Sequence, residues 1–107
     1  SVESSPGALN SGVERGLFVY QNHCQACHGA NRQGVKPLFP PLIGSKKTKK
    51  EMFAGIRNGQ GLMPAFPQLS KAEIDDVIRY ITLPEDAEVK ITNPGAKTRY
   101  QAIVASV

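Results

Sequence analysis

The sequence contains no tryptophan, and aromatic residues make up only 7% of its 107 positions. Glycine and proline are frequent, with 10 and 8 residues, so the side chains alone give one domain of this length a modest core. Hydrophobic residues at 40% and charged residues at 21% are nevertheless ordinary for a folded globular protein and exclude wholesale disorder. A large apolar cofactor would supply the missing core volume.

Long apolar runs are also absent. None approaches the roughly 18 residues that span a bilayer, so we expect a chain that is not transmembrane. Residues 1–12 lack the basic and then apolar pattern of a signal peptide, which indicates that a leader was removed or that the chain is part of a longer protein. The formal net charge of +4 comes without a nucleic-acid recognition motif, so we expect no nucleic-acid partner.

Three capping boxes predict three helices. In a capping box, a Ser or Thr and a Glu three residues later each satisfy a backbone N–H group of the other at the start of a helix. The pairs are Ser11 with Glu14, Thr48 with Glu51, and Ser70 with Glu73. Apolar residues follow each pair at helical spacing, and the last helix must end before Pro84. Long loops rich in Gly and Pro separate these segments, so the predicted fold is all-α.

The same pattern divides the chain into three parts. Residues 1–10 lack periodicity and are predicted to be a flexible N-terminal segment, while residues 11–83 form the compact domain. Residues 84–107 are predicted to be a C-terminal extension. We expect it to be irregular or hairpin-like, because apolar and polar residues alternate on either side of the turn signal Asn93-Pro94-Gly95.

Both cysteines and one of the two histidines stand together in Cys24-Gln25-Ala26-Cys27-His28. This C-x-x-C-H spacing is that of a c-type haem attachment site, in which both thiols add to the haem vinyl groups and the histidine becomes the proximal ligand of the iron. Two intervening residues let one short turn reach both vinyl groups. We therefore predict one covalently bound haem c.

Three other kinds of site share a C-x-x-C pair. A thioredoxin-like redox disulfide would need a βαβ context, whereas this motif ends a predicted helix and enters a proline-rich loop. A zinc site would need a second pair of ligands, but the chain has only two Cys and two His residues. A structural disulfide between residues three apart would close a very small loop and stabilise little.

From residue 11 to residue 83 the sequence resembles the class I cytochromes c. That family has a glycine eight residues and an aromatic residue four residues before the first cysteine, as Gly16 and Tyr20 are here. The resemblance implies the class I cytochrome c fold, with three main helices and long loops around one haem. It also implies that the first and last helices cross closely, with Val77 and Tyr80 as the partners on the last helix.

The resemblance further implies roles around the iron. The carbonyl of Pro40, twelve residues after His28, would accept the Nδ1 proton of that histidine, and Leu42 would pack against the haem. For the other axial ligand the chain offers two methionines. Met63 lies in a loop beside a proline, as the family ligand does, whereas Met52 lies on a predicted helix, where methionine is usually a core residue. We predict that the metal ligands are His28 and Met63.

Two axial side chains leave no open position for oxygen or peroxide, so we expect a single-electron carrier and not an enzyme. The alternative is a haem-based sensor or peroxidase with an open or labile distal site. Expected partners are other redox proteins or a fused dehydrogenase domain. The expected location is periplasmic or otherwise extracytoplasmic, because the family attaches haem outside the bacterial cytoplasm, and we expect this chain to be monomeric.

Four lysines begin the second predicted helix, at Lys46, Lys47, Lys49 and Lys50. Cations at a helix N-terminus oppose the macrodipole, so local stability does not explain them. Two interpretations are open: the lysines form a solvated surface, or they steer an acidic redox partner by electrostatic attraction.

Overall fold

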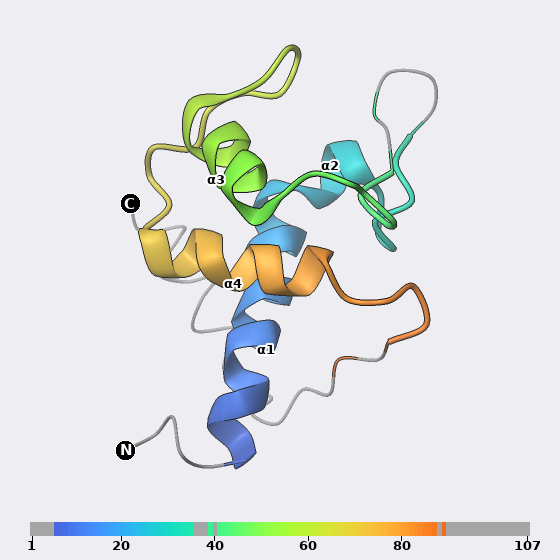
Figure 1. Cartoon of the computed structure of the whole chain (residues 1–107), viewed down its shortest axis with the longest axis vertical. Helices are drawn as coiled ribbons and strands as arrows, with labels where there is room; N and C mark the ends of the chain where they lie inside the picture. The colour runs from blue at the N-terminus through green and yellow to red at the C-terminus, as the bar shows by residue number, and fades with distance from the viewer. Residues whose placement is uncertain (1–5, 36–38, 40, 88, 90–107) are drawn as a thin grey trace.

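The computed structural model describes residues 6–35, 39, 41–87 and 89. Within these residues four helices follow one another, α1 (Pro6–His23), α2 (Gln25–His28), α3 (Lys49–Asn58) and α4 (Lys71–Ile81) (Figure 1). The described residues form no strand, only two isolated bridges. The prediction of an all-α fold is confirmed. No helix in the described ranges is both long enough and apolar enough to cross a membrane.

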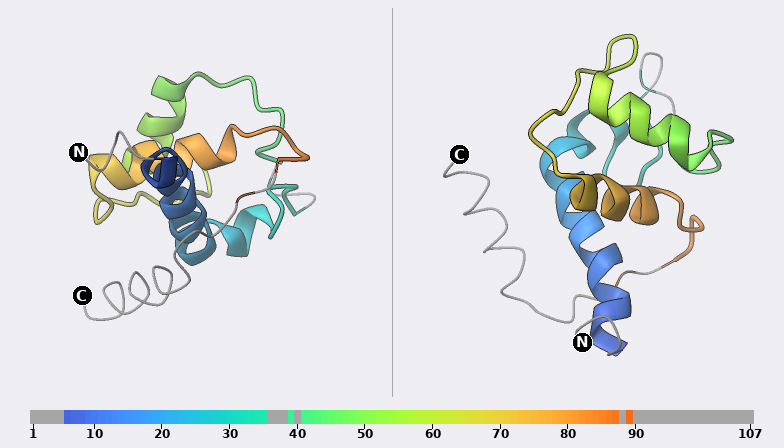
Figure 2. Two further views of the ribbon diagram at one scale, coloured as in Figure 1. Left: turned by 90° about the horizontal axis from the view of Figure 1, so that it is seen from below. Right: turned by 60° about the vertical axis from the view of Figure 1, so that its left-hand side comes forward.

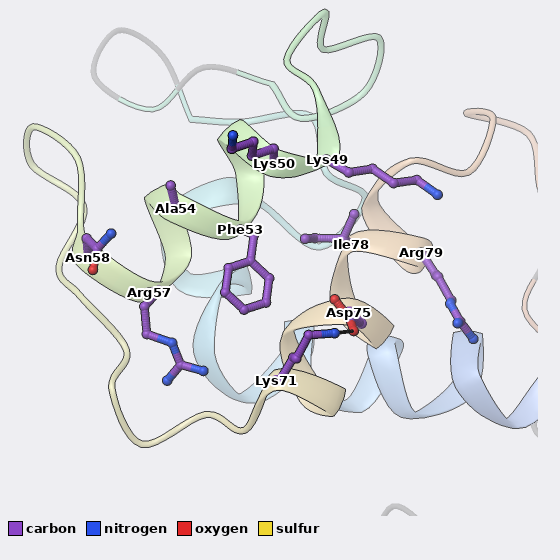
Figure 3. Close-up of a pocket in the computed structure, with 10 residues that line it drawn as sticks. All are labelled: Lys49, Lys50, Phe53, Ala54, Arg57, Asn58, Lys71, Asp75, Ile78 and Arg79. Atoms are coloured by element: carbon purple, nitrogen blue, oxygen red, sulfur yellow. Dashed lines mark hydrogen bonds and ion pairs between the residues drawn. The ribbon is translucent and has the colours of Figure 1, made fainter.

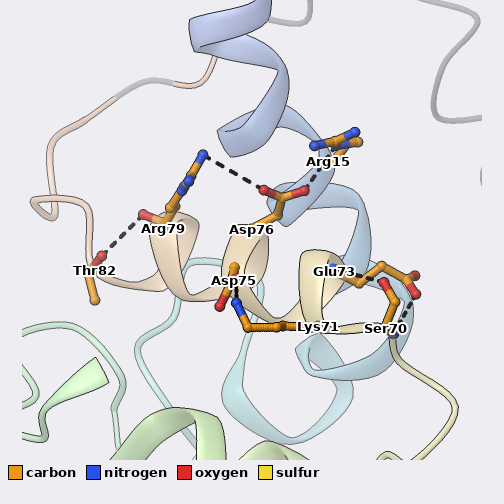
Figure 4. A network of polar contacts seen from close by, with 8 residues as sticks. All are labelled: Arg15, Ser70, Lys71, Glu73, Asp75, Asp76, Arg79 and Thr82. Carbon is orange, nitrogen blue, oxygen red and sulfur yellow. Dashed lines mark hydrogen bonds and ion pairs between the residues drawn. The ribbon is translucent and has the colours of Figure 1, made fainter. Parts of the chain in front are cut away.

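Two of the three predicted capping boxes are present. At the start of α3, the Glu51 backbone N–H donates to Thr48 Oγ1 over 3.1 Å, and the Thr48 N–H donates to Glu51 Oε1 over 2.8 Å. Ser70 and Glu73 make the same pair of hydrogen bonds at the start of α4, with lengths of 3.1 and 2.9 Å (Figure 4). Both helices therefore begin one residue after the predicted cap.

The predicted start of the first helix was wrong. α1 begins at Pro6, so Ser11 lies inside the helix and does not cap it. Proline favours the first turn of a helix because its φ angle is already helical and its missing N–H would have had no partner there. The proline is thus a start signal that the prediction did not use.

α1 and α4 cross at close range, and both views of Figure 2 show this crossing. A Cβ atom added to Gly16 would lie 2.0 Å from the backbone oxygen of Asp76 and 3.1 Å from Cβ of Tyr80. The rings of Tyr20 and Tyr80 meet with their centroids 5.2 Å apart. Val77 is also buried at this crossing. The helix crossing implied by the family resemblance is therefore confirmed, and Gly16 is what permits it.

The buried hydrophobic core comes from a few segments. Its members are Phe18, Val19, Tyr20, Ile56, Leu69, Ile74, Val77, Ile78, Tyr80 and Ile81. None of the described hydrophobic residues between positions 24 and 55 is buried to the same degree. The core is thus built mainly on α1 and α4, with one residue from α3.

The predicted hairpin-like tail lies almost entirely outside the described residues. Of the extension, the structure describes residues 84–87 and 89, and Val89 is half-buried against the core. The division of the chain at residues 10 and 83 stays a prediction.

Candidate functional site

The motif Cys24–His28 forms one helical turn at the end of α1. The amide of Cys27 donates to the carbonyl oxygen of Cys24 over 3.2 Å, and the amide of His28 donates to the same oxygen over 2.9 Å. Residues three apart on such a turn share a face, so the two thiols point to the same side. Both cysteines are free thiols and half-buried. This arrangement suits attachment of both sulfurs to one planar group.

The environment of Cys24 disfavours a redox-active dithiol. Burial raises the pKa of the Cys24 thiol to about 12, and the neighbouring Cys27 adds to the shift. A reactive cysteine pair has the opposite property, a lowered thiol pKa. In the ranges that the structure describes, no three His, Cys, Asp or Glu side chains gather as a metal-binding group. The thioredoxin-like and zinc interpretations therefore gain no support from the structure.

Several apolar side chains from the motif onward are half-buried. They pack against the core on one side and keep part of their surface exposed, and they include Cys24, Leu42, Met52, Met63 and Phe66. A flat apolar group with two reactive edges fits these residues together with Cys27 and His28, because they offer apolar surface, two thiols and the sulfur and nitrogen ligands that haem iron accepts. The residues present are thus compatible with haem c.

Tyr20 holds the backbone next to His28. Its hydroxyl donates to the carbonyl oxygen of Gly29, the residue that directly follows the histidine. Burial, followed by the nearby Cys24 and Tyr80, raises the pKa of this phenol, so it remains a donor. Gly29 has a φ angle of 86°, a left-handed conformation that favours glycine. Sequence reasoning assigned Tyr20 to the helix crossing and missed this second contact.

Met63 lies in a short, well-defined loop. Its amide donates to the carbonyl oxygen of Gln60 over 2.9 Å, and the Gln60 amide donates back over 3.0 Å. Farther along the same loop, the ring of Phe66 lies edge-on to His23 with a centroid distance of 5.8 Å. Because His23 directly precedes Cys24, this contact brings the loop of Met63 to the end of α1 beside the motif. Met52, on α3, is half-buried as well.

Of the residues predicted around the iron, the structure describes all but one. Cys24, Cys27, His28, Leu42 and Met63 are all half-buried. Pro40 lies outside the described residues, so its predicted hydrogen bond to the histidine stays a prediction.

Arg32 was missed by sequence reasoning. It is only 4% exposed, and its guanidinium donates to the carbonyl oxygens of Tyr80, Leu83 and Pro84 over 3.3, 2.7 and 3.2 Å. The same group lies 5.2 Å from the ring centroid of Tyr80. Arg32 thus ties the loop after His28 to the end of α4. A single arginine four residues after the motif carries no sequence signal for this role.

Comparison with known proteins identifies relatives that are named as cytochromes. A family model described as cytochrome c oxidase, cbb3-type, subunit III matches residues 12–81. Cytochrome c6 of Bryopsis maxima is 32% identical over 79 residues, which cover 64% of this chain and 88% of that protein. Cytochrome c6 of a Picosynechococcus species is 32% identical over 87 residues, which cover 69% and 74% of the two chains.

A longer relative matches nearly the whole chain. The cytochrome bc1 complex cytochrome c subunit of Mycobacterium tuberculosis is 28% identical over 111 aligned positions. The alignment covers 94% of this chain but only 37% of that subunit. The relatives thus include small proteins of similar length and a subunit of which this chain spans little more than a third.

Proposed function

The chain belongs to the c-type cytochrome family described as cytochrome c oxidase, cbb3-type, subunit III, and we propose that His28 and Met63 ligate the iron of its haem. As a member of this family it carries one covalently bound haem c and transfers electrons. The proposal concerns which residues hold the cofactor and what that coordination permits.

The helical turn of the motif is the observation that carries the proposal. Cys24 and Cys27 lie on one face of a single turn, and the His28 amide is bonded to the Cys24 carbonyl over 2.9 Å, which fixes the histidine beside both thiols. The hydrogen bond from Tyr20 to Gly29 holds the next residue in place. Cys24 and Cys27 would bind the haem covalently, and His28 would supply the proximal nitrogen.

Two observations favour Met63 over Met52 as the second ligand. The loop of Met63 is closed by paired backbone hydrogen bonds and contacts the end of α1 through Phe66 and His23. Met52 lies within the regular helix α3, whose half-buried face already packs on the core. A loop residue can approach the iron from the side opposite the motif without displacing a helix.

This coordination defines what the protein can do. When bound, the haem supplies a one-electron couple at its iron. His28 and Met63 would together hold the iron and exclude small ligands such as oxygen from it. A neutral thioether favours the reduced iron, so Met63 would raise the potential relative to two nitrogen ligands. Leu42 and Pro40 would support the haem and orient the histidine.

We infer the setting of the carrier from its relatives. The subunit of the cytochrome bc1 complex among them is named for a redox assembly, which supports redox proteins as partners of this chain, while a fused dehydrogenase domain stays a prediction. We place the protein in the periplasm or another extracytoplasmic compartment and expect it to be monomeric.

A pair of methionine variants tests the ligand assignment. Met63→Ala should remove the sulfur-to-iron charge-transfer band from the absorption spectrum of the oxidised holoprotein, lower the potential, and allow carbon monoxide to bind the reduced iron. Met52→Leu, the matched control on α3, should change none of these. The reverse pattern would identify Met52 as the ligand. Rapid carbon monoxide binding by the unmodified holoprotein would instead support the sensor or peroxidase alternative.

A further inference from the structure

A groove of about 570 Å³ runs between α3 and α4, and we call it the α3–α4 groove (Figure 3). Its lining residues are Lys49, Lys50, Phe53, Ala54, Arg57, Asn58, Lys71, Asp75, Ile78 and Arg79. None of them belongs to the motif Cys24–His28 or to the loop of Met63. The groove therefore includes neither the attachment motif nor the proposed iron ligand Met63.

The α3–α4 groove holds the whole net charge of the chain. Five of its lining residues are Lys or Arg and one is Asp, so it carries a formal charge of +4. The complete sequence has 13 basic and 9 acidic residues and is also +4. Elsewhere eight basic residues therefore balance eight acidic ones. The lining of this one groove therefore carries a formal charge as large as that of the whole sequence.

Local contacts do not account for the lysines at the start of α3. Lys71 is paired with Asp75 over 3.0 Å, and the Arg57 guanidinium donates to the carbonyl oxygen of Leu69 over 2.8 Å. Lys49 and Lys50 form no ion pair with any residue that the structure describes. They also stand in the first turn of α3, where positive charge is unfavourable to the helix. Their charges are thus available to a partner.

The floor of the groove is apolar. Phe53 lies between the two helices in Figure 3, with Ala54 beside it on α3 and Ile78 opposite on α4. The guanidinium of Arg57 lies 5.7 Å from the ring centroid of Phe53, which joins the floor to the cationic rim. A small inorganic anion would use only the rim. An acidic polypeptide with an apolar side chain would use both rim and floor.

We propose that the α3–α4 groove docks an acidic segment of a partner protein, with an apolar side chain of that segment on Phe53, Ala54 and Ile78. The carboxylates of the segment pair with Lys49 and Lys50. Long-range attraction to the concentrated charge also speeds the encounter. Because the groove contains no residue of the motif or of the Met63 loop, a docked partner is held on α3 and α4 while the motif remains uncovered. This surface adds a tethering role to electron transfer.

Two charge-reversal pairs in the holoprotein test the proposal. The probe is a synthetic nine-residue peptide with eight glutamates and a central phenylalanine, and its affinity is measured by NMR titration of the reduced, isotope-labelled protein. Lys49→Glu with Lys50→Glu should weaken binding by about tenfold or more. Lys46→Glu with Lys47→Glu changes the net charge equally but alters no lining residue, and it should weaken binding by less than about threefold. Equal losses in the two pairs would overturn the proposal.

The apolar floor has its own test. Replacing the central phenylalanine of the peptide by alanine should weaken binding by about fivefold, because burial of an apolar side chain contributes roughly 1 kcal/mol or more. Equal affinity of the two peptides would show that the groove offers charge alone, which overturns docking of a polypeptide there.

Binding to phosphatidylglycerol vesicles without peptide binding would assign the groove to a membrane surface instead. All four lysines are exposed, and an unchanged haem spectrum in each variant confirms that it is folded.

Discussion

The crossing of α1 and α4 and the segment from residue 24 to residue 55 are built in different ways. At the crossing, Gly16 allows the backbones to touch, and Tyr20, Val77 and Tyr80 are buried. In the other region the only described residue buried to that degree is Arg32, which is held by hydrogen bonds. Larger apolar side chains there, such as Leu42 and Met52, are half-buried.

The difference assigns separate roles to the two regions. Protein atoms alone complete the packing at the crossing, so its stability depends on shape complementarity between two helices. From residue 24 to residue 55, none of the hydrophobic side chains that the structure describes is fully buried, so this segment is suited to pack on the covalently attached haem. Substitutions in either region, or in the contact that links them, test this difference.

The largest expected effect comes from losing covalent haem. In the double variant Cys24→Ala with Cys27→Ala, we expect the chain to be largely unfolded at room temperature, because a haem bound only to the folded state no longer stabilises it. Circular dichroism measures the helix content. Native helix content without haem would show that the crossing folds by itself. The proposed dependence of the segment from residue 24 to residue 55 on haem would then be wrong.

The second prediction concerns Gly16. Gly16→Ala should reduce the free energy of unfolding by about 3 kcal/mol, because the new Cβ would lie 2.0 Å from the Asp76 backbone oxygen and one helix must move. Denaturant titration of the holoprotein measures the loss.

Gly12 provides the matched control in the same helix. A Cβ at Gly12 would meet Nη1 of Arg79 at 2.8 Å, the far end of a flexible side chain that can move aside. Alanine is also favoured over glycine within a helix by about 1 kcal/mol. Gly12→Ala should therefore leave stability unchanged or slightly raised. Similar losses in both variants would mean that the close approach is not specific to residue 16.

The third prediction concerns the link between the two regions. Arg32→Met should reduce the free energy of unfolding by about 2 kcal/mol, because three carbonyl oxygens lose a charged donor. Arg79→Met is the control, since the Arg79 side chain is 61% exposed, and it should cost about 0.5 kcal/mol or less. Thermal unfolding of both holoproteins compares them. Equal losses would show that Arg32 is not a special link.

The sequence predicted well those features that depend on local patterns. The capping boxes at Thr48 and Ser70 depend only on residues three apart, and both are present. The single-turn geometry of the motif also follows from its spacing, and the structure agrees. The start of α1 at Pro6 was missed, because only the capping box at Ser11 was used as a start signal.

Features that depend on distant contacts were missed. Arg32 acts on carbonyl oxygens 48 to 52 residues away, and no local pattern marks such a partner. Asp76 is charged, yet it is only 5% exposed and lies opposite Gly16, where a helical pattern predicts an apolar residue. The four lysines were treated as one cluster, but only Lys49 and Lys50 line the α3–α4 groove, because Lys46 and Lys47 precede the N-cap Thr48 and lie outside the helix.

The smallest expected effect is a pH dependence from Asp76 at the crossing. Arg15 from α1 pairs with its carboxylate over 2.9 Å, Arg79 on α4 lies at 4.0 Å, and both are drawn in Figure 4. Burial nevertheless raises the pKa of Asp76 above its ordinary value of 3.8, with the neighbouring Asp75 adding to the rise and the two arginines opposing it. The folded protein therefore binds this proton more tightly than the unfolded chain does. The resulting stabilisation is complete below pH 3.8 and is lost as the pH rises through the raised pKa.

Comparison with Asp76→Asn isolates this effect, because asparagine resembles the protonated acid and haem-linked titrations are common to both proteins. The free energy of unfolding of the native protein, relative to this variant, should fall as the pH rises from 3 towards 7. Asp75→Asn changes the net charge equally and serves as the reference for the effect of charge alone. A relative stability that instead increases with pH would mean that the ion pair with Arg15 outweighs burial. The crossing would then depend on charge as well as on the close packing around Gly16.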